Sequence, residues 1–223
     1  IDLDNLATTD GTITIDAGGA VTADDSTISG NAITITAGTR VDFGNNITSG
    51  GGDITITGDE KVQIKDGSTL ASGGGDIRLT GDEYVKLAGD HNVNSSGGDI
   101  TLTATGKESL NKVWIKDDVT IASGGGNILI NGDGSVDIDL DVTMTSGGGD
   151  ITIDVLNNDI SIDKNLTVKS QGGDIKFTTG DYIYFYDDNN VTSGGGDITM
   201  TSAGLVGAYH DNTFDSSGVS RNG

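Results

Sequence analysis

Apolar and polar residues alternate in very short segments that recur along the whole chain. Branched apolar residues take every second position in 54–56, 62–64 and 69–71, and polar turns separate these three segments. The same set of three returns at 151–153, 160–162 and 166–168. Period-two alternation is typical of half-buried strands, and these segments are too short and too often interrupted for helices. We therefore expect three short β-strands in each repeat.

A glycine-rich word marks each repeat. Its fullest form is Ser-Gly-Gly-Gly-Asp-Ile-Thr-Ile, and we call the residue directly before the first Ile the anchor. Seven clear copies and two weaker copies near the start place the anchors at Thr12, Ala32, Asp53, Asp76, Asp99, Asn127, Asp150, Asp174 and Asp197. Successive anchors are 20, 21, 23, 23, 28, 23, 24 and 23 residues apart. A regular period of this length is the signature of a solenoid.

The repeat predicts an all-β fold, a right-handed parallel β-helix (β-solenoid) in which about nine coils form one domain over residues 1–223. Parallel coils stack at about 4.8 Å, so nine of them rise about 43 Å. An antiparallel sandwich would require hairpin turns and varied loops in place of a repeated word. The 28-residue step predicts a loop insertion near 104–112. The predicted inward ladder consists of Ile54, Ile77, Ile100, Ile128, Ile151, Ile175 and Ile198.

The unusual composition fits this architecture. A net charge of −22 with only 33% apolar residues would ordinarily indicate disorder, but a narrow tube needs few apolar residues per coil. The glycines allow corners with positive φ, and the following Asp or Asn can bond to nearby amides in an Asx-type turn. Proline is absent, as expected where most N–H groups bond to the next coil.

The same composition excludes several classes of protein. The chain has no cysteine and two histidines, which argues against thiolate metal sites and His-based triads. No apolar run is long enough for membrane insertion, and the acidic charge disfavours nucleic acid as a partner. Because the first residue is Ile, we expect a processed product or a segment of a longer repetitive chain.

Acidic turns are the first candidate site. Turns after the second strand carry the weak calcium candidates Asp66, Asp90, Asp117, Asp139, Asp163 and Asp187. Neighbouring carboxylates about 4.8 Å apart repel by about 0.9 kcal/mol even in water, and Ca²⁺ would relieve that repulsion. Solvated acids that only confer solubility explain the pattern as well. Apart from this Ca²⁺ alternative, the sequence indicates no cofactor.

Aromatic residues form the second candidate site. Strand parity turns five of them outward on the second-strand face, where they could stack on sugars or anchor a protein; these are Tyr84, Trp114, Tyr182, Tyr184 and Tyr186. The alternative is that these positions bind no ligand and that aromatic residues simply favour pleated surfaces. Parity also places Trp114 and Tyr184 three coils apart, about 14 Å.

Two further functions are weighed and set aside. Outward threonine pairs on the first-strand face resemble ice-binding arrays, but Arg78, Leu129, Asp154 and Lys176 interrupt them. Threonine's β-propensity explains the pairs without ice. Some parallel β-helices cleave acidic polysaccharides, but we expect no enzyme, because uniform turns, few bases and no partnered acid and base are seen.

The repeat words Ser-Gly-Gly-Gly-Asp-Ile-Thr-Ile and Gly-Asn-Ala-Ile-Thr-Ile-Thr resemble the shaft repeats of filamentous-haemagglutinin-like bacterial exoproteins. The resemblance implies a secreted protein at the bacterial surface, with an extended structural role as the rigid shaft of an adhesin. One alternative is an extracellular filament subunit whose solenoid ends stack head to tail. The other is a carbohydrate-binding module that uses the aromatic face. The corresponding partners are further copies of the chain, or a host or cell-surface protein or glycan.

Overall fold

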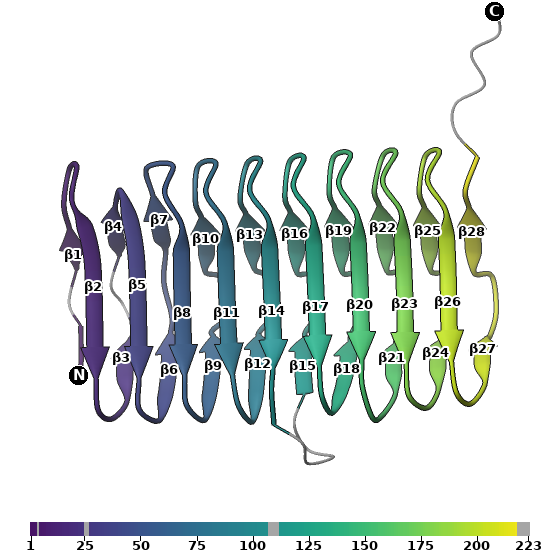
Figure 1. Ribbon diagram of the computed structural model, residues 1–223, viewed down its shortest axis with the longest axis horizontal. Coiled ribbons are helices and arrows are strands. Elements are labelled where there is room, and N and C mark those ends of the chain that lie inside the picture. The colour runs from purple at the N-terminus through teal and green to yellow at the C-terminus, as the bar shows by residue number, and fades with distance from the viewer. Residues whose placement is uncertain (4, 25–26, 107–111, 218–223) are drawn as a thin grey trace, which may run out of the picture.

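The computed structural model describes residues 1–3, 5–24, 27–106 and 112–217. These residues form 28 β-strands and no helix, wound into a β-solenoid of about nine coils (Figure 1). Each coil contributes one strand to each of three parallel sheets. The predicted fold class is therefore confirmed. We name the sheets first-strand, second-strand and third-strand, after the order of their strands within a coil.

The first-strand sheet contains β2 (Thr12–Ala17), β5 (Ala32–Ala37), β8 (Ile54–Gly58), β11 (Ile77–Gly81), β14 (Ile100–Ala104), β17 (Ile128–Gly132), β20 (Ile151–Val155), β23 (Ile175–Thr179) and β26 (Ile198–Ser202). The second-strand sheet contains β3 (Val21–Ala23), β6 (Arg40–Phe43), β9 (Lys61–Ile64), β12 (Tyr84–Leu87), β15 (Lys112–Ile115), β18 (Ser135–Ile138), β21 (Ile160–Ile162), β24 (Ile183–Phe185) and β27 (Val206–Ala208). The third-strand sheet contains β1 (Leu6–Ala7), β4 (Ile28–Gly30), β7 (Ile47–Ser49), β10 (Thr69–Ala71), β13 (Asn92–Asn94), β16 (Thr120–Ala122), β19 (Thr143–Thr145), β22 (Thr167–Lys169), β25 (Asn190–Thr192) and β28 (Thr213–Asp215).

The coil is right-handed. In Figure 1 the first-strand sheet faces the viewer with its strands running down, the other sheets run up behind it, and the chain advances to the right. This is the hand that parallel crossovers favour. Every strand pairs in parallel with the equivalent strand of the next coil, so equivalent residues stack in columns along the axis.

The core is a set of stacked apolar columns. Register places Ile54, Ile77 and Ile100 in one column, and the column continues as predicted through Ile128, Ile151, Ile175 and Ile198. The first six of these are fully buried, whereas Ile198 in the last coil is only partly buried. Because the three sheets enclose a narrow tube, a few inward residues per coil are enough to exclude water.

The glycine corner between the third and first strands is held by two polar ladders. In the first, a buried serine hydroxyl, such as that of Ser123, lies near the carbonyl three residues ahead and 3.0 Å from the carbonyl of Ser146 in the next coil. In the second, the side chain of each anchor from Asp53 to Asp174 accepts the backbone N–H of the next anchor. The expectation of an Asx-type bond within one turn is therefore wrong, because these bonds join adjacent coils.

Two glycines of the corner have different roles. Gly147 has φ +73°, a conformation that residues with a side chain adopt at a cost. Gly149 has no such angle, but a Cβ there would lie 2.4 Å from the carbonyl oxygen of Gly126 in the preceding coil. Two copies lack the first glycine, and Ser96 and Gln171 take that position with φ +58° and +60°. The corner thus tolerates a strained residue at the first position.

The turn between the second and third strands uses a different device. Among the described residues of this turn, the left-handed residue is glycine only at Gly67; in later coils Asp or Asn takes the position, since their short polar side chains tolerate positive φ. One buried side chain here is ionisable. His91 accepts the Ser68 N–H on Nδ1 at 3.1 Å, and its Nε2 lies 2.7 Å from the Ile64 carbonyl. Burial lowers the pKa of His91, which fits a neutral ring with its proton on Nε2.

The long repeat places its extra residues between β14 and β15. The first strand ends at Ala104 and the second begins at Lys112, whereas β11 and β12 are separated only by residues 82–83. Part of the predicted insertion near 104–112, residues 107–111, lies outside the described residues.

Candidate functional site

The second-strand face carries the predicted aromatic residues and is the most varied surface of the solenoid. Its inward residues, such as Val113, Ile115, Ile183 and Phe185, are fully buried. The residues between and beside them point outward, so the predicted parity of the aromatic side chains is confirmed. Trp114 and Tyr184 share one outward column, separated by Asp137 and Ser161, which makes them three coils apart as predicted.

Basic, acidic and aromatic side chains occupy separate zones along this face. Six of the chain's 12 basic residues form a basic zone over β6 to β15: Arg40, Lys61, Lys65, Lys86, Lys112 and Lys116. An acidic zone follows around β18 and β21, with Asp137, Asp139, Asp159 and Asp163. Four of the five tyrosines then form a tyrosine zone around β24 and β27: Tyr182, Tyr184, Tyr186 and Tyr209.

Trp114 lies at the junction of the basic and acidic zones. The ammonium groups of Lys116, Lys112 and Lys86 lie 4.0, 4.1 and 5.2 Å from its ring centroid. Its indole N–H donates to Asp139 Oδ1 at 3.1 Å, and Lys116 is paired with the same carboxylate. Lys112 Nζ lies 2.6 Å from Asp137 Oδ2. The ring is therefore held in place by cation–π contacts and one hydrogen bond.

Tyr84 occupies an equivalent setting one coil earlier. Lys61 Nζ lies 5.3 Å from its ring centroid, and its hydroxyl donates to Gln63 Oε1 at 3.5 Å. The contact with Tyr84 raises the pKa of Lys61, which keeps this amine charged. Tyr84 and Trp114 thus each lie close to lysine ammonium groups, which strand parity alone did not predict.

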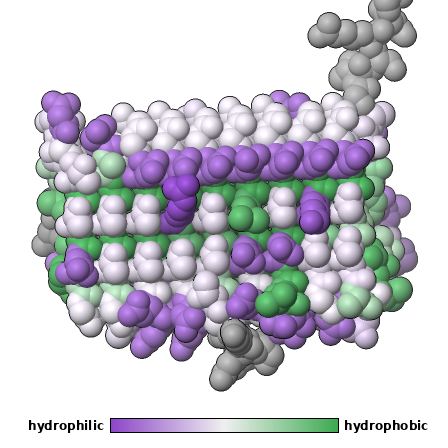
Figure 2. Space-filling view, viewed as in Figure 1, coloured by the Kyte–Doolittle hydropathy of each residue, from purple (hydrophilic) through white to green (hydrophobic). Residues whose placement is uncertain are grey.

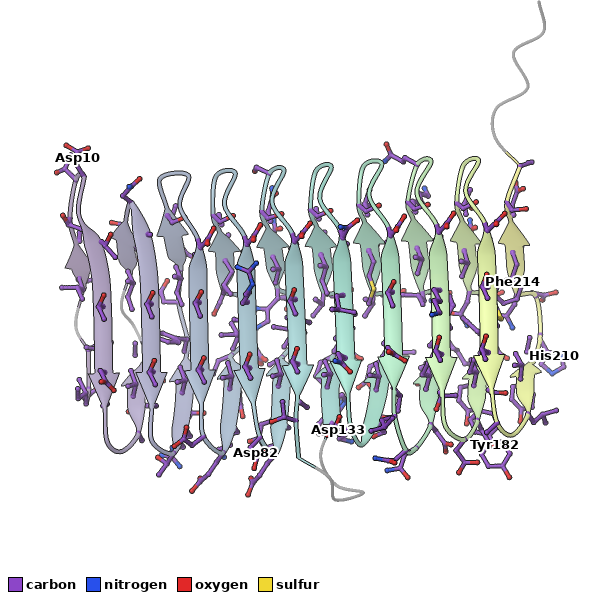
Figure 3. The ribbon with its side chains drawn as sticks, viewed as in Figure 1. Asp10, Asp82, Asp133, Tyr182, His210 and Phe214 are labelled. Carbon is purple, nitrogen blue, oxygen red and sulfur yellow. The ribbon has the colours of Figure 1, made fainter. Side chains whose placement is uncertain are left out.

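The tyrosine zone is a row of nearly parallel rings at the C-terminal end of the face. Tyr182 and Tyr184 have centroids 5.7 Å apart with planes at 23°, and Tyr184 and Tyr186 are 6.5 Å apart at 28°. Tyr209 of the next coil stacks on Tyr186 at 5.3 Å and 6°. Figure 3 shows Tyr182 projecting from the lower edge of the solenoid. Sequence reasoning missed Tyr209, although it lies two residues beyond Gly207, with outward parity.

A shallow groove of about 430 Å³ lies between the aromatic groups. Trp114 lines one side and Tyr186 the other, with Asp137, Asp139 and Asp163 among the residues between them. Two of these carboxylates are already paired with lysines. A smaller groove of about 180 Å³ lies on the basic side of Trp114. The grooves on the two sides of this indole ring therefore differ in charge.

The six calcium candidates are divided among three positions of the turn. Asp66, Asp117 and Asp187 take one position, where Gly89, Leu140 and Lys164 separate them and His210 follows; Asp139 and Asp163 take a second, and Asp90 a third. Several have protein partners, since Asp66 accepts the Gly89 N–H at 3.1 Å and Asp117 the Leu140 N–H at 3.2 Å. Lys164 hydrogen-bonds to Asp187 at 2.7 Å and so lowers the pKa of that carboxyl. Within the described ranges, no three acidic or histidine side chains form a group that could hold a metal ion.

The first-strand face is flat and mostly threonine. Figure 2 shows this face, with a continuous hydrophilic row above two paler columns that other residues interrupt. The row lies where the anchors precede the strands. In one column Arg78, Leu129 and Lys176 interrupt the threonines, as predicted. In the other, the predicted interruption at Asp154 is joined by Asp16 and Asn131, which were not among the predicted interruptions.

Searches against protein-family models, curated proteins and solved structures find no match for this chain. In the part of the chain that is described, no helix is long and apolar enough to cross a membrane. The likeness of the repeat words to exoprotein shafts stays a prediction.

Proposed function

We propose that this chain is a rigid, non-catalytic shaft of an extracellular bacterial surface protein. The observation that carries the proposal is the unbroken register of all three parallel sheets from the first coil to the last. Equivalent residues stack through backbone hydrogen bonds, apolar columns and two polar ladders, so bending the rod would break many bonds at once. Such a rod holds whatever is attached at its two ends a fixed distance apart, as a spacer must.

The surface chemistry supports the same proposal. Acidic turns and anchors surround most of the rod, and a net charge of −22 keeps separate rods apart in solution. The grooves on the described surface are shallow and lie on the sheet faces, the edges and one end, without long loops to enclose a substrate. Catalysis would require a more enclosed site with partnered acid and base groups.

A second candidate, head-to-tail assembly, is favoured by the C-terminal coil. Ile198, Met200, Phe214 and Ser216 line a groove of about 400 Å³ there, and Leu205 is 61% exposed. Figure 3 shows Phe214 at this end of the solenoid. At the opposite end Ile1 and Leu6 are also exposed. Strand pairing between such ends in two copies would continue the sheets.

Negative-stain imaging of the material isolated from its source, with and without a chelator, tests both candidates. The shaft proposal predicts straight rods of constant width, with a segment of about 43 Å for these nine coils. Long fibres built from repeats of that length would favour head-to-tail assembly instead. Calcium would be implicated if the chelator dissolved the fibres. Bent or globular particles would refute both candidates.

A further inference from the structure

The small groove beside Trp114 has an unusual lining for so acidic a chain. About 180 Å³ in volume, it is lined by Gln63, Tyr84, Lys86, Lys112 and Trp114. The chain has 34 acidic residues against 12 basic ones, yet this lining contains two amines, an amide, a phenol and an indole, and no carboxylate. A concave site of this composition is suited to an anionic ligand that also presents a ring surface.

Sheet register explains how the site is built. Tyr84 pairs with Lys112, and Lys86 pairs with Trp114, on the adjacent strands β12 and β15. Coils are about 4.8 Å apart, and outward residues of one strand are about 6.6 Å apart. Lys86 and Lys112 therefore lie at two opposite corners of a small rectangle, and Tyr84 and Trp114 lie at the other two. Gln63 adds its amide from the preceding strand β9.

The charges of the groove are only partly neutralised. Lys112 is paired with Asp137, which lies on the next coil. Lys86 forms no ion pair with any described residue, and its ammonium group lies 5.2 Å from the Trp114 centroid. Lys116, which is paired with Asp139, brings a third ammonium group to the same ring from outside the groove. An added anion would relieve the mutual repulsion of these amines.

We propose that this groove binds the carboxylate of a sugar unit, a uronic acid residue of an acidic glycan. Lys86 and Lys112 donate to the carboxylate oxygens, the Gln63 amide donates to a ring or hydroxyl oxygen, and Tyr84 and Trp114 contact the sugar ring. A singly charged group fits better than a phosphate, because Asp137 lies beside Lys112 and repels additional negative charge.

A nucleic acid is disfavoured by the neighbouring surface. The groove of Asp137, Asp139 and Asp163 begins on the other side of Trp114, so a continuous phosphate chain running along the rod would meet carboxylates. A glycan in which neutral sugars separate the uronic acid units can place one carboxylate in the basic groove without bringing the next one against these acids. Binding here is independent of the shaft proposal, since rigidity depends on the core and corners.

The single tryptophan of the chain gives a direct assay. Trp114 lines the groove, so its fluorescence should change saturably when glycan oligomers in which galacturonic acid alternates with a neutral sugar are added to the intact protein. The same oligomers with their carboxylates methyl-esterified keep the shape of the sugar and lose the charge. We expect the acid form to bind, the ester to bind at least about tenfold more weakly, and added salt to weaken the acid form.

Two matched variants locate the site. Lys86→Gln should weaken binding of the acid oligomer about tenfold, because it removes the amine without a carboxylate partner. Lys176→Gln makes the same charge change on the first-strand face and should leave binding unchanged. Far-ultraviolet circular dichroism and thermal unfolding show whether each variant keeps the fold.

Four results would overturn the inference. They are equal binding of acid and ester, equal loss in the two lysine variants, tighter binding of a single-stranded oligonucleotide, and no fluorescence change at millimolar oligomer. In each case the imaging test of the shaft would still stand on its own result.

Discussion

The most demanding prediction concerns Gly149, the third glycine of a corner. A Cβ at this position would lie 2.4 Å from the carbonyl oxygen and 2.6 Å from the carbonyl carbon of Gly126. Real Cβ contacts essentially never fall below 3.0 Å, so Gly149→Ala must open the corner by about 0.6 Å. The obstructing atoms are backbone and cannot rotate away.

Opening the corner strains the bonds between these two coils. The Asp150 N–H donates to Asn127 Oδ1 at 2.8 Å, the Ile128 N–H donates to the Asp150 carbonyl at 2.8 Å, and Ser123 Oγ lies 3.0 Å from the Ser146 carbonyl. Overpacking costs about 1–3 kcal/mol, and weakening two of these three hydrogen bonds adds about 1 kcal/mol each. We expect Gly149→Ala to lower the free energy of unfolding by about 3–5 kcal/mol.

Guanidinium unfolding followed by circular dichroism and by Trp114 fluorescence measures this change. Two variants separate its causes. Gly148→Ala meets no atom within 4 Å but has φ +126°, so it should cost about 1–3 kcal/mol for backbone strain alone. Gly19→Ala has open space and no positive φ, and should be close to neutral. If Gly149→Ala proved no worse than Gly148→Ala, close stacking of coils would not be the reason for the third glycine.

Three further predictions concern the polar ladders and turns. Asp174→Asn keeps an acceptor for the Asp197 N–H, as Asn127 does for Asp150, and removes repulsion from two neighbouring anchors. It should stabilise the protein by about 1 kcal/mol at low salt and by less at 1 M salt, and a gain that does not depend on salt would contradict this cause. Gln171→Gly relieves a left-handed residue at φ +60°, and should raise the free energy of unfolding by up to about 1 kcal/mol in denaturant titrations. For His91, a lowered native pKa means that the unfolded chain binds a proton more readily, so stability should be full above about pH 6.5 and decline below it. His91→Asn removes this titrating ring and should flatten the decline between pH 7 and 5. The fold should tolerate the change, because Asn189 in the equivalent turn accepts the Leu166 N–H at 2.8 Å. An unchanged pH profile would exclude His91 as the cause.

The sequence predicted the fold because one face of every strand is buried. Alternation of branched apolar and polar residues fixes which side chains point inward, so the isoleucine ladder and the outward aromatic residues could be named in advance. The anchors supplied the register between coils. Both signals are local or strictly periodic, and each can be detected without knowing the structure of the turns.

The turns and the charged surface were harder to predict. The six candidate calcium ligands fall at three turn positions, because residues counted loosely as following a strand are separated once hydrogen bonds fix their register. The basic zone was missed because Lys61, Lys86 and Lys112 come from different repeats and look like scattered charges along the sequence. Alignment of the second strands in register would have revealed it.

The corner ladders also bear on how such a protein changes its length over generations. Each 23-residue unit, such as 128–150, contributes one donor and one acceptor to every ladder and takes the same from its neighbours. Unequal recombination between two copies in the gene would therefore insert or delete a whole coil without creating an unmatched interface. Selection for reach can then act on the number of copies, while the steric limit at glycines such as Gly149 keeps the cross-section constant.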